Sequence, residues 1–390
     1  MKVGMRILHL AFEDPARPGS GGGSIRTREI NRRLAGRHEI TAVVAGYPGA
    51  APRLENGIRW VPIGTRTGTK RDMLAYFALL GTAVRRHPHD LVVEDFGAPF
   101  SVGFSPFYTR KPVVAMVQWL FAAEKRAEYG LPFDWVENAG LPFYKDFIAT
   151  SPWLADVLRR RRPGSVIEAI PNGVDAEAFA VDPSPPRHLL YVGRLEIGQK
   201  GCDLLLDSVA LARVTLGDTM PPLVVVGDGP DRAALEQRAR NLGLADVVEF
   251  RGRVDGPAKY RLMASSYAVL MPSRYETFGM VAVESLAATA PLIAFDVGPL
   301  GEVAGPGGAR LVPPFNLDAF AQEIISIVRD RRGLDLSRLQ GRAWATRYNW
   351  DRIAALQEDH YRHALARAPG VASRRAPGSL CIPYRTKKSR

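Results

Sequence analysis

Cysteine is almost missing from this chain of 390 residues, in which only Cys202 and Cys381 occur. Two distant thiols without a paired spacing argue against a disulfide framework and against a zinc site. The longest apolar run, near residues 75–84, is far shorter than the ~20 residues of a membrane-spanning helix. Residues 1–10 lack the pattern of a secretory signal. These absences predict a soluble, cytoplasmic protein without a metal site.

The chain also has fewer acidic than basic residues. It contains 40 Asp and Glu and 52 Lys and Arg, which gives a net charge of +12. Residues 1–186 carry 24 basic and 19 acidic side chains, and residues 187–368 carry 22 and 21. Residues 369–390 carry six basic side chains and no acidic ones, which is half of the net charge. We expect residues 369–390 to form a disordered basic tail. The nearly neutral second half argues against a nucleic-acid-binding protein.

The remaining composition is ordinary for a globular protein, with 46% hydrophobic and 24% charged residues. Short apolar runs alternate with amphipathic stretches, which predicts parallel sheets with crossover helices. The length fits two domains of about 150–200 residues, and three prolines within residues 181–187 indicate the linker. We predict an α/β protein with two doubly wound, Rossmann-like domains, residues 1–180 and 181–349, facing each other across a cleft. The clearest predicted strands are Arg6–Ala11, Glu39–Ala45, Val113–Val117, His188–Val192, Pro222–Val226, Ala268–Met271 and Leu292–Phe295.

A glycine-rich segment, Gly21–Ser24, follows the first predicted strand. Glycine lets the backbone approach a phosphate or a sugar closely. Ser24 is a suitable cap for a helix over Ile25–Leu34. The segment is therefore a candidate phosphate loop, and a flexible loop without a ligand is the alternative.

Two glutamates separated by seven residues, Glu276 and Glu284, form the strongest constellation in the chain. Glu276 lies between a predicted strand and a helix that begins near Gly279, where free backbone N–H groups can bind an anion. Glu284 lies within an otherwise apolar helix, and burying a carboxylate without a partner is costly. We expect a partner such as a ribose diol. A surface carboxylate at a helix start and an internal salt bridge are the respective alternatives.

Two cations, Arg194 and Lys200, lie on a glycine-containing loop directly after the strand His188–Val192. Their spacing suits a diphosphate, although two solvated surface cations explain it as well. Gly227 and Gly229 resemble part of a dinucleotide fingerprint that lacks its third glycine. A dinucleotide-dependent oxidoreductase is therefore disfavoured.

Arginine gathers in two places in the first half of the chain. Arg159–Arg162 end one predicted helix, and five arginines lie on the helix after the glycine-rich segment: Arg26, Arg28, Arg32, Arg33 and Arg37. Such a patch could meet an anionic acceptor or the inner face of a membrane, and solvated helix ends are the alternative. His9, within an apolar strand, is interpreted as a packed core histidine.

Together these segments resemble the retaining glycosyltransferases of family 4, which have the GT-B fold. The most specific motif is Glu276 to Glu284 with Phe278-Gly279 inside it. The supporting matches are Gly193-Arg194-Leu195 with Lys200-Gly201, Val226–Pro230, Ile170–Asp175 and the glycine-rich segment. The resemblance extends to about residue 365. It implies that the final helix, residues 350–368, crosses back to the first domain.

The resemblance also implies roles for individual residues. Arg194, Lys200, Glu276 and Gln118 form the implied catalytic group, in which the two cations neutralise the leaving diphosphate and Glu276 holds hydroxyls of the donor sugar. Glu284 would take the ribose hydroxyls. The implied donor-binding residues are Gly22, Gly23, Gly193, Arg253, Val254, Phe278, Gly279, Met280, Val281 and Glu284. The resemblance implies neither a metal nor a cofactor.

The implied reaction moves a sugar from a nucleotide-diphosphate sugar to an acceptor hydroxyl with retention of configuration. A UDP-sugar is favoured, a GDP-sugar is possible, and the acceptor is a small molecule, a glycan or a lipid-linked sugar. A nucleotide-sugar epimerase on the same fold is the alternative. The chain departs from the family at Gln118, where a histidine is frequent, and glutamine forms hydrogen bonds but does not titrate. Aromatic residues that follow could line the acceptor side or pack in the core: Trp119, Phe121, Tyr129, Phe133 and Trp135.

Overall fold

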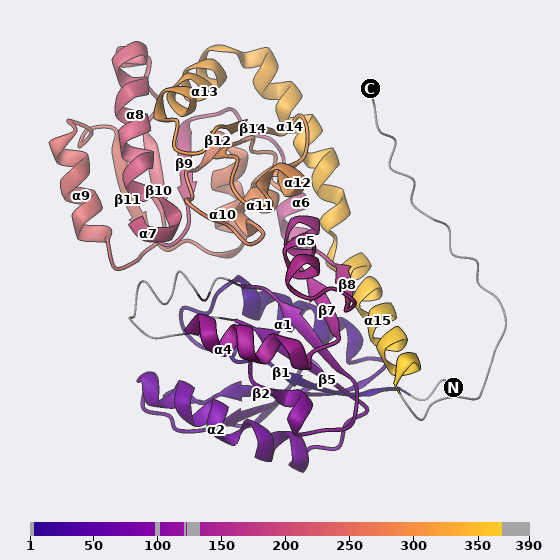
Figure 1. Ribbon diagram of the computed structural model, residues 1–390. Coiled ribbons are helices and arrows are strands. Elements are labelled where there is room, and N and C mark those ends of the chain that lie inside the picture. The colour runs from indigo at the N-terminus through magenta and orange to yellow at the C-terminus, as the bar shows by residue number, and fades with distance from the viewer. Residues whose placement is uncertain (1–3, 98–101, 121, 123–132, 369–390) are drawn as a thin grey trace, which may run out of the picture.

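The computed structural model describes residues 4–97, 102–120, 122 and 133–368 (Figure 1). The tail predicted for residues 369–390 lies outside the described residues, as do Phe121 and Tyr129. Two sheets, one parallel and the other parallel except for one edge strand, are each surrounded by helices and form two lobes that follow one another along the chain. This α/β architecture confirms the predicted fold class.

The first lobe is an eight-stranded sheet with the order β3-β4-β2-β1-β5-β6-β7-β8. Its strands are β1 (Arg6–Leu10), β2 (Glu39–Ala45), β3 (Arg53–Glu55), β4 (Ile58–Ile63), β5 (Leu91–Phe96), β6 (Val113–Val117), β7 (Asp146–Ala149) and β8 (Val166–Ala169). All neighbours are parallel except β3 and β4. Its helices are α1 (Gly22–Leu34), α2 (Lys70–Arg86), α4 (Phe133–Gly140) and α5 (Pro152–Arg161), with short 3₁₀ turns Ser105–Phe107 and Leu141–Phe143. The strand order reverses between β1 and β5, the place where open α/β sheets bind ligands.

The second lobe is a six-stranded parallel sheet with the order β11-β10-β9-β12-β13-β14. Its strands are β9 (His188–Val192), β10 (Leu223–Val226), β11 (Val248–Gly252), β12 (Ser266–Met271), β13 (Leu292–Phe295) and β14 (Ala309–Val312). Its helices are α6 (Ala176–Phe179), α7 (Ile197–Lys200), α8 (Cys202–Leu216), α9 (Arg232–Asn241), α10 (Gly256–Ala264), α11 (Met280–Ala287), α12 (Leu300–Ala304), α13 (Leu317–Arg329) and α14 (Arg331–Ala345). Here the order reverses between β9 and β12, the strands that precede Lys200 and Glu276.

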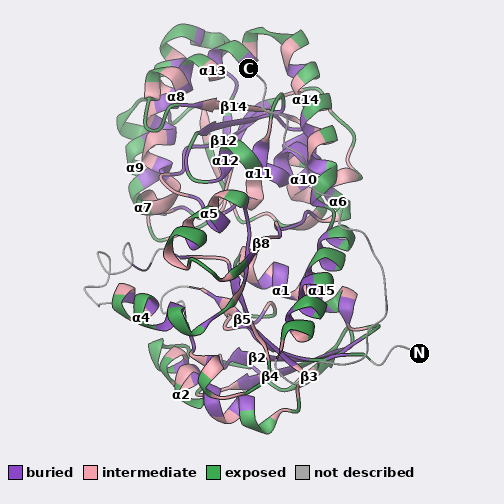
Figure 2. Cartoon of the chain, turned by 45° about the vertical axis from the view of Figure 1, so that its right-hand side comes forward, coloured by how far each residue is buried: buried purple, intermediate pink, exposed green. Residues whose placement is uncertain are grey.

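The final helix, α15 (Trp350–Arg367), returns from the second lobe and lies beside α1 of the first (Figure 1). Trp350, Ile353 and Tyr361 belong to the same apolar core as strands β1 and β2. Asn349 caps the helix by accepting the backbone N–H of Asp351 at 2.8 Å. As a result, α15 buries one face against the first lobe. Figure 2 shows buried residues on the strands and on the inner face of α15, while the outer face of this helix is exposed.

One local prediction was wrong. Helix α1 begins at Gly22, with Gly21 in the capping position, so Ser24 lies inside its first turn. The hydroxyl of Ser24 donates to the carbonyl of Gly21 at 2.7 Å instead of accepting a backbone N–H. The first backbone N–H groups of the helix therefore have no side-chain cap.

Candidate active site

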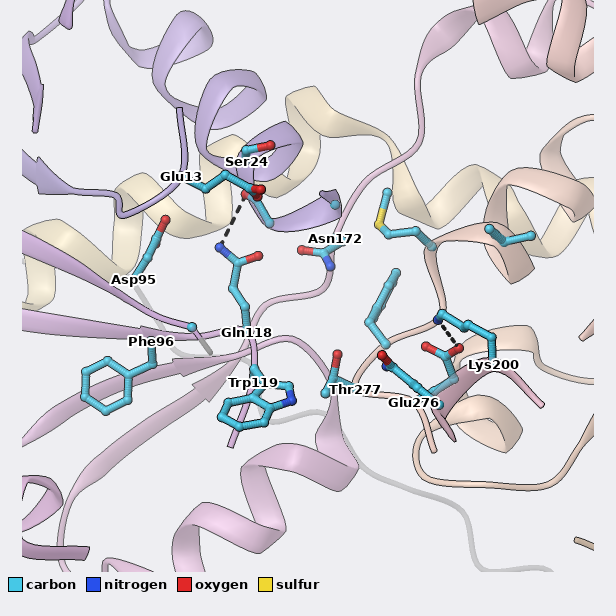
Figure 3. A pocket seen from close by; sticks show the side chains of 18 of the residues that line it. Glu13, Ser24, Asp95, Phe96, Gln118, Trp119, Asn172, Lys200, Glu276 and Thr277 are labelled. Carbon is cyan, nitrogen blue, oxygen red and sulfur yellow. Dashed lines mark hydrogen bonds and ion pairs between the residues drawn. The ribbon is translucent and has the colours of Figure 1, made fainter. Parts of the chain in front are cut away.

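The glycine-rich segment and the loops after β9 and β12 meet at a cavity of about 470 Å³ between the two lobes (Figure 3). The first lobe and the segment after β8 contribute Phe12, Glu13, Gly22, Gly23, Ser24, Asp95, Phe96, Gly97, Gln118, Trp119 and Asn172. The second lobe contributes Gln199, Lys200, Met271, Glu276, Thr277, Phe278, Gly279, Met280 and Val281. Because both sheets present their carboxyl ends here, the cavity lies where doubly wound sheets bind ligands.

Lys200 and Glu276 form an ion pair on the second-lobe side of the cavity. The Nζ of Lys200 lies 2.7 Å from Oε1 of Glu276, and Ser273 donates to the same oxygen at 2.8 Å. Glu276 is buried, whereas about a quarter of the Lys200 side chain, 24%, remains exposed. The Lys200 side chain is therefore accessible from the cavity, while Lys200 and Ser273 hold the buried carboxylate of Glu276.

Two helix N-termini approach the cavity from opposite lobes. Helix α11 starts after Gly279 and helix α1 after Gly21, and neither start has a side-chain cap. A Cβ atom added to Gly22 would lie 3.3 Å from Cγ of Met280, so the two ends are close neighbours. Uncapped N–H groups carry partial positive charge and bind anions. The arrangement therefore presents partial positive charge to an anion in the cavity without a cluster of basic side chains.

Gln118 follows β6 and packs against the glycine-rich segment. Its Nε2 donates to the carbonyl of Gly23 at 3.4 Å, as the dashed line in Figure 3 shows. A Cβ atom at position 23 would lie only 2.8 Å from Oε1 of Gln118. Glycine at position 23 therefore leaves room for this amide in the cavity.

Several residues assigned by resemblance are not among those that line this cavity. Arg194 forms an ion pair with Glu196 and donates to Oε1 of Gln199 at 3.1 Å. Arg253 pairs with Asp255 at 2.8 Å, and Val254 borders a separate hollow near α10. Gly193 lies beside the Tyr191 hydroxyl, since a Cβ added there would be 2.9 Å from that oxygen.

Glu284 is also held away from the cavity lining. Its Oε2 lies 2.9 Å from Nζ of Lys259 on α10. Burial raises the pKa of the Glu284 carboxyl, and the neighbouring Lys259 ammonium opposes that rise. The internal salt bridge that was the alternative for Glu284 is thus present. Its role toward a ribose remains a prediction.

Sequence reasoning missed Asp95 and Glu13, two carboxylates on the first-lobe side of the cavity. Asp95 is at the carboxyl end of β5, where its Oδ1 lies 3.0 Å from Nε2 of His9 and its Oδ2 accepts from Thr27 at 2.7 Å. Glu13 accepts the backbone N–H of Gly21 at 2.9 Å, and burial raises the pKa of its carboxyl. An acidic residue at the carboxyl end of a buried parallel strand was the signal that could have revealed Asp95. His9 is buried, as predicted for a core histidine.

The arginines of α1 are largely engaged within the protein. Arg32 and Arg33 each pair with Glu29 at 2.6 Å. Arg37 was expected on the same helix but follows its end at Leu34, and it pairs with Glu358 of α15 at 2.5 Å. Arg26 is buried and donates to the carbonyl of Pro171 at 2.6 Å and to Oδ1 of Asn172 at 2.8 Å. These side chains tie α1 to α15 and to the segment after β8, so contact with a membrane or an anionic acceptor remains a prediction.

Two negative findings apply to the described residues. No described group of three or more His, Cys, Asp or Glu side chains is arranged to hold a metal ion. Among the described helices, none combines the length and apolar character needed to cross a bilayer.

Comparisons with known proteins assign the chain to a family. Residues 20–178 match the model of Glycosyltransferase Family 4, and residues 176–343 match the model of Glycosyl transferases group 1. The structure of sucrose-phosphate synthase from Thermosynechococcus elongatus superposes with a TM-score of 0.77 at 22% identity, over 93% of this chain and 99% of that one. The chain belongs to the GT-B glycosyltransferases of the family 4 type. The predicted family and fold are therefore confirmed.

Two further relatives extend this comparison. Glycogen synthase of Mycobacterium tuberculosis strain H37Rv is 27% identical over 333 residues, which cover 78% of this glycosyltransferase and 72% of that enzyme. Anabaena HepE in complex with UDP and glucose has a TM-score of 0.71 at 19% identity, over 91% of this glycosyltransferase and 98% of that chain.

Proposed function

We propose that this glycosyltransferase moves a sugar from a nucleotide-diphosphate sugar, with a UDP-sugar favoured, to an acceptor hydroxyl with retention of configuration and without a metal ion. The observation that carries the proposal is the Lys200–Glu276 pair beside two uncapped helix N-termini in the interlobe cavity. The complex of HepE with UDP and glucose supports the choice of nucleotide.

The chemistry follows from the charges around the cavity. A bound diphosphate would draw the Lys200 ammonium from Glu276 and lie between the N-termini of α1 and α11. As the bond from the sugar to the β-phosphate oxygen breaks, negative charge grows on that phosphate. The helix N–H groups stabilise this charge because they already point toward the cavity, and Lys200 adds to this once it has left Glu276. They supply the positive charge that a bound metal ion would otherwise provide.

Glu276 has a different task in this proposal. Its carboxylate would accept hydrogen bonds from hydroxyls of the donor sugar once Lys200 has moved to the phosphate, while Ser273 keeps it in place. The acceptor hydroxyl attacks from the face that the nucleotide leaves, and a leaving phosphate oxygen takes its proton. This route retains the configuration without a covalent intermediate. Arg194 and Glu284 would reach the donor only if their present partners release them.

The proposal is tested by ligand binding followed by kinetics. We expect UDP to raise the melting temperature more than GDP or ADP in a thermal-shift screen, because binding to the folded state stabilises it by mass action. Lys200→Ala and Glu276→Ala should each lower transfer about a hundredfold, the effect of losing one strong electrostatic group. Lys111→Ala, an exposed lysine of the first lobe, is the matched control and should not change the rate.

Two results would contradict the proposal. Near-normal rates for both active-site variants would exclude the assigned roles of Lys200 and Glu276. Turnover of the nucleotide-sugar to an isomer, without acceptor-dependent release of the nucleotide, would point to an epimerase instead.

A further inference from the structure

The two halves of the cavity differ in charge. Among the described residues that line it, the second lobe provides Lys200 and Glu276, which neutralise each other. The first lobe provides Asp95 and Glu13, and no described lining residue on that side is a cation. The side of the cavity opposite Lys200 is therefore acidic, although the first lobe as a whole is basic.

Asp95 of β5 is held in place by two other elements of the first lobe. Thr27 of α1 donates to Oδ2 at 2.7 Å, and His9 of β1 lies 3.0 Å from Oδ1. The other ring nitrogen of His9 lies 2.9 Å from Nδ2 and 3.2 Å from Oδ1 of Asn31. With Nδ2 of Asn31 as the donor to this nitrogen, the Nε2–H of His9 donates to Asp95. Among the described residues, each carboxylate oxygen thus has one donor, which leaves a lone pair on each oxygen for a ligand. The side chain keeps 12% of its surface exposed, at the wall of the cavity.

A fixed carboxylate selects its ligand by charge and by hydrogen-bonding capacity. It accepts hydrogen bonds and donates none, so it pairs with hydroxyl groups and repels a phosphate. Glu13 adds a second carboxylate near the N-terminus of α1, and Trp119 provides an aromatic wall in the same cavity (Figure 3). Carboxylates beside an aromatic surface suit a ring that has hydroxyl groups on its rim and C–H groups on its face.

We propose that the part of the acceptor inside this cavity is a neutral polyhydroxylated ring, a sugar or a cyclitol, and that Asp95 is the residue that selects it over a phosphorylated ring. Asp95 accepts hydrogen bonds from hydroxyls of the acceptor, while Thr27 and His9 act as positioning residues. This inference rests on the proposed function and specifies its acceptor class. Arg32 and Arg33 of α1 do not offset the preference, since Glu29 already pairs with them. The buried Arg26 donates instead to the Pro171 carbonyl, Asn172 and Gln357.

The test measures acceptor binding to the full chain with two matched pairs of probes. The pairs are glucose with glucose 6-phosphate, and myo-inositol with myo-inositol 1-phosphate, titrated by calorimetry or ligand-observed NMR with and without UDP. In at least one pair, we expect the neutral member to bind at least about tenfold more tightly, the scale of one hydrogen bond to a charged group. Asp95→Asn should weaken neutral binding by about the same factor and shrink the preference, because the phosphate no longer meets a charge.

Controls separate selection from folding and from donor binding. Asp90→Asn removes a carboxylate at the opposite end of β5, where it pairs with Arg6, and should leave the preference unchanged. Thr27→Val should reduce the preference partway, because Asp95 loses one of its two anchors. Retained UDP binding in each variant shows an intact fold.

The possible outcomes are distinct. If wild-type protein binds the phosphorylated ring as well as its neutral partner in both pairs, or binds no neutral probe, the inference is wrong. It is also wrong if Asp95→Asn leaves the preference intact. A protein that fails to bind UDP contradicts the proposed donor instead, and the ratio measured without UDP still decides the acceptor class.

Discussion

At the scale of the residue, α11 and the loop before it hold two glutamates that both pair with a lysine from another element. Glu276 pairs with Lys200 at the cavity, and Glu284 pairs with Lys259 behind it. The second pair is enclosed on both sides, with 16% of the Lys259 side chain and 9% of the Glu284 side chain exposed. A buried ion pair adds little net stability, but losing one partner leaves an uncompensated charge.

Lys259→Met should therefore lower the free energy of unfolding at pH 8 by about 3 kcal/mol, the scale for breaking a buried pair. The pKa of Glu284 is already raised by burial, and it rises further without Lys259. A carboxyl with a raised folded pKa loses its contribution as pH increases, so the deficit should grow between pH 5 and pH 8. Urea unfolding of the wild type and the variant at pH 5 and at pH 8 measures this difference in the free energy of unfolding.

The matched control is the double variant Lys259→Met with Glu284→Gln. It leaves no buried charge and should recover most of the lost stability. The charge of Glu284 would not be the cause if the loss of unfolding free energy in Lys259→Met were the same at both pH values. The same conclusion would follow if the double variant were no more stable than the single one.

At the scale of the element, the short helix α7 and the start of α8 determine where Lys200 lies. Arg274 braces them by donating to the carbonyl of Ile197 at 2.6 Å and to Asp203 at 2.8 Å. Gly201 joins the two helices with a φ of +62°, and a Cβ atom there would lie 2.1 Å from the carbonyl oxygen of Pro272. Both the left-handed backbone and the close approach require glycine.

Gly201→Ala should destabilise the protein by about 2 kcal/mol or more, through the left-handed conformation and the clash together. Because Lys200 is the preceding residue, transfer should fall further than stability alone explains. Gly198→Ala in α7 is the control, since a Cβ there meets no atom within 4 Å. Melting temperature and transfer rate are measured together. If Gly201→Ala and Gly198→Ala have the same melting temperature and the same transfer rate, Gly201 has no role in positioning Lys200.

At the scale of the whole molecule, contacts between distant segments hold the two lobes around the cavity. Thr150 of the first lobe donates to the carbonyl of Thr277 at 3.3 Å, and Glu302 of α12 accepts the backbone N–H of Trp153 at 2.8 Å. Arg26 joins α1 to Gln357 of α15 at 2.5 Å. The interlobe geometry therefore depends on residues that lie far from each other in the sequence.

Removing residues 369–390 takes away six basic side chains and lowers the net charge from +12 to +6. The cavity-lining residues that the structure describes all precede this segment. We expect transfer to a soluble acceptor to stay within about twofold of the full chain, because electrostatic effects of distant exposed charges are screened by salt. Steady-state kinetics of the truncated protein measures this, and a loss of most activity would show that the tail takes part in catalysis.

Much of the fold followed from local patterns. The runs at residues 39–45, 188–192 and 292–295 are strands β2, β9 and β13 as predicted, since apolar β-branched residues in short runs suit buried parallel strands. Strands β3, β4, β7, β8 and β14 were not assigned, as they are short or mix polar and apolar residues. Helix α1 was placed too late, because glycine at its start obscured a helix that tertiary contacts stabilise.

The sequence by itself determined the two α/β lobes and the family, and it singled out Lys200, Glu276 and Gln118, because spacing and residue type are local properties of the chain. Only the tertiary structure decided which charged side chains form ion pairs and which line the cavity. It paired Lys259 with Glu284, engaged the arginines of α1 and brought Asp95 to the cavity. Pairing energies depend on distance and burial, and neither is determined by neighbouring residues in the chain.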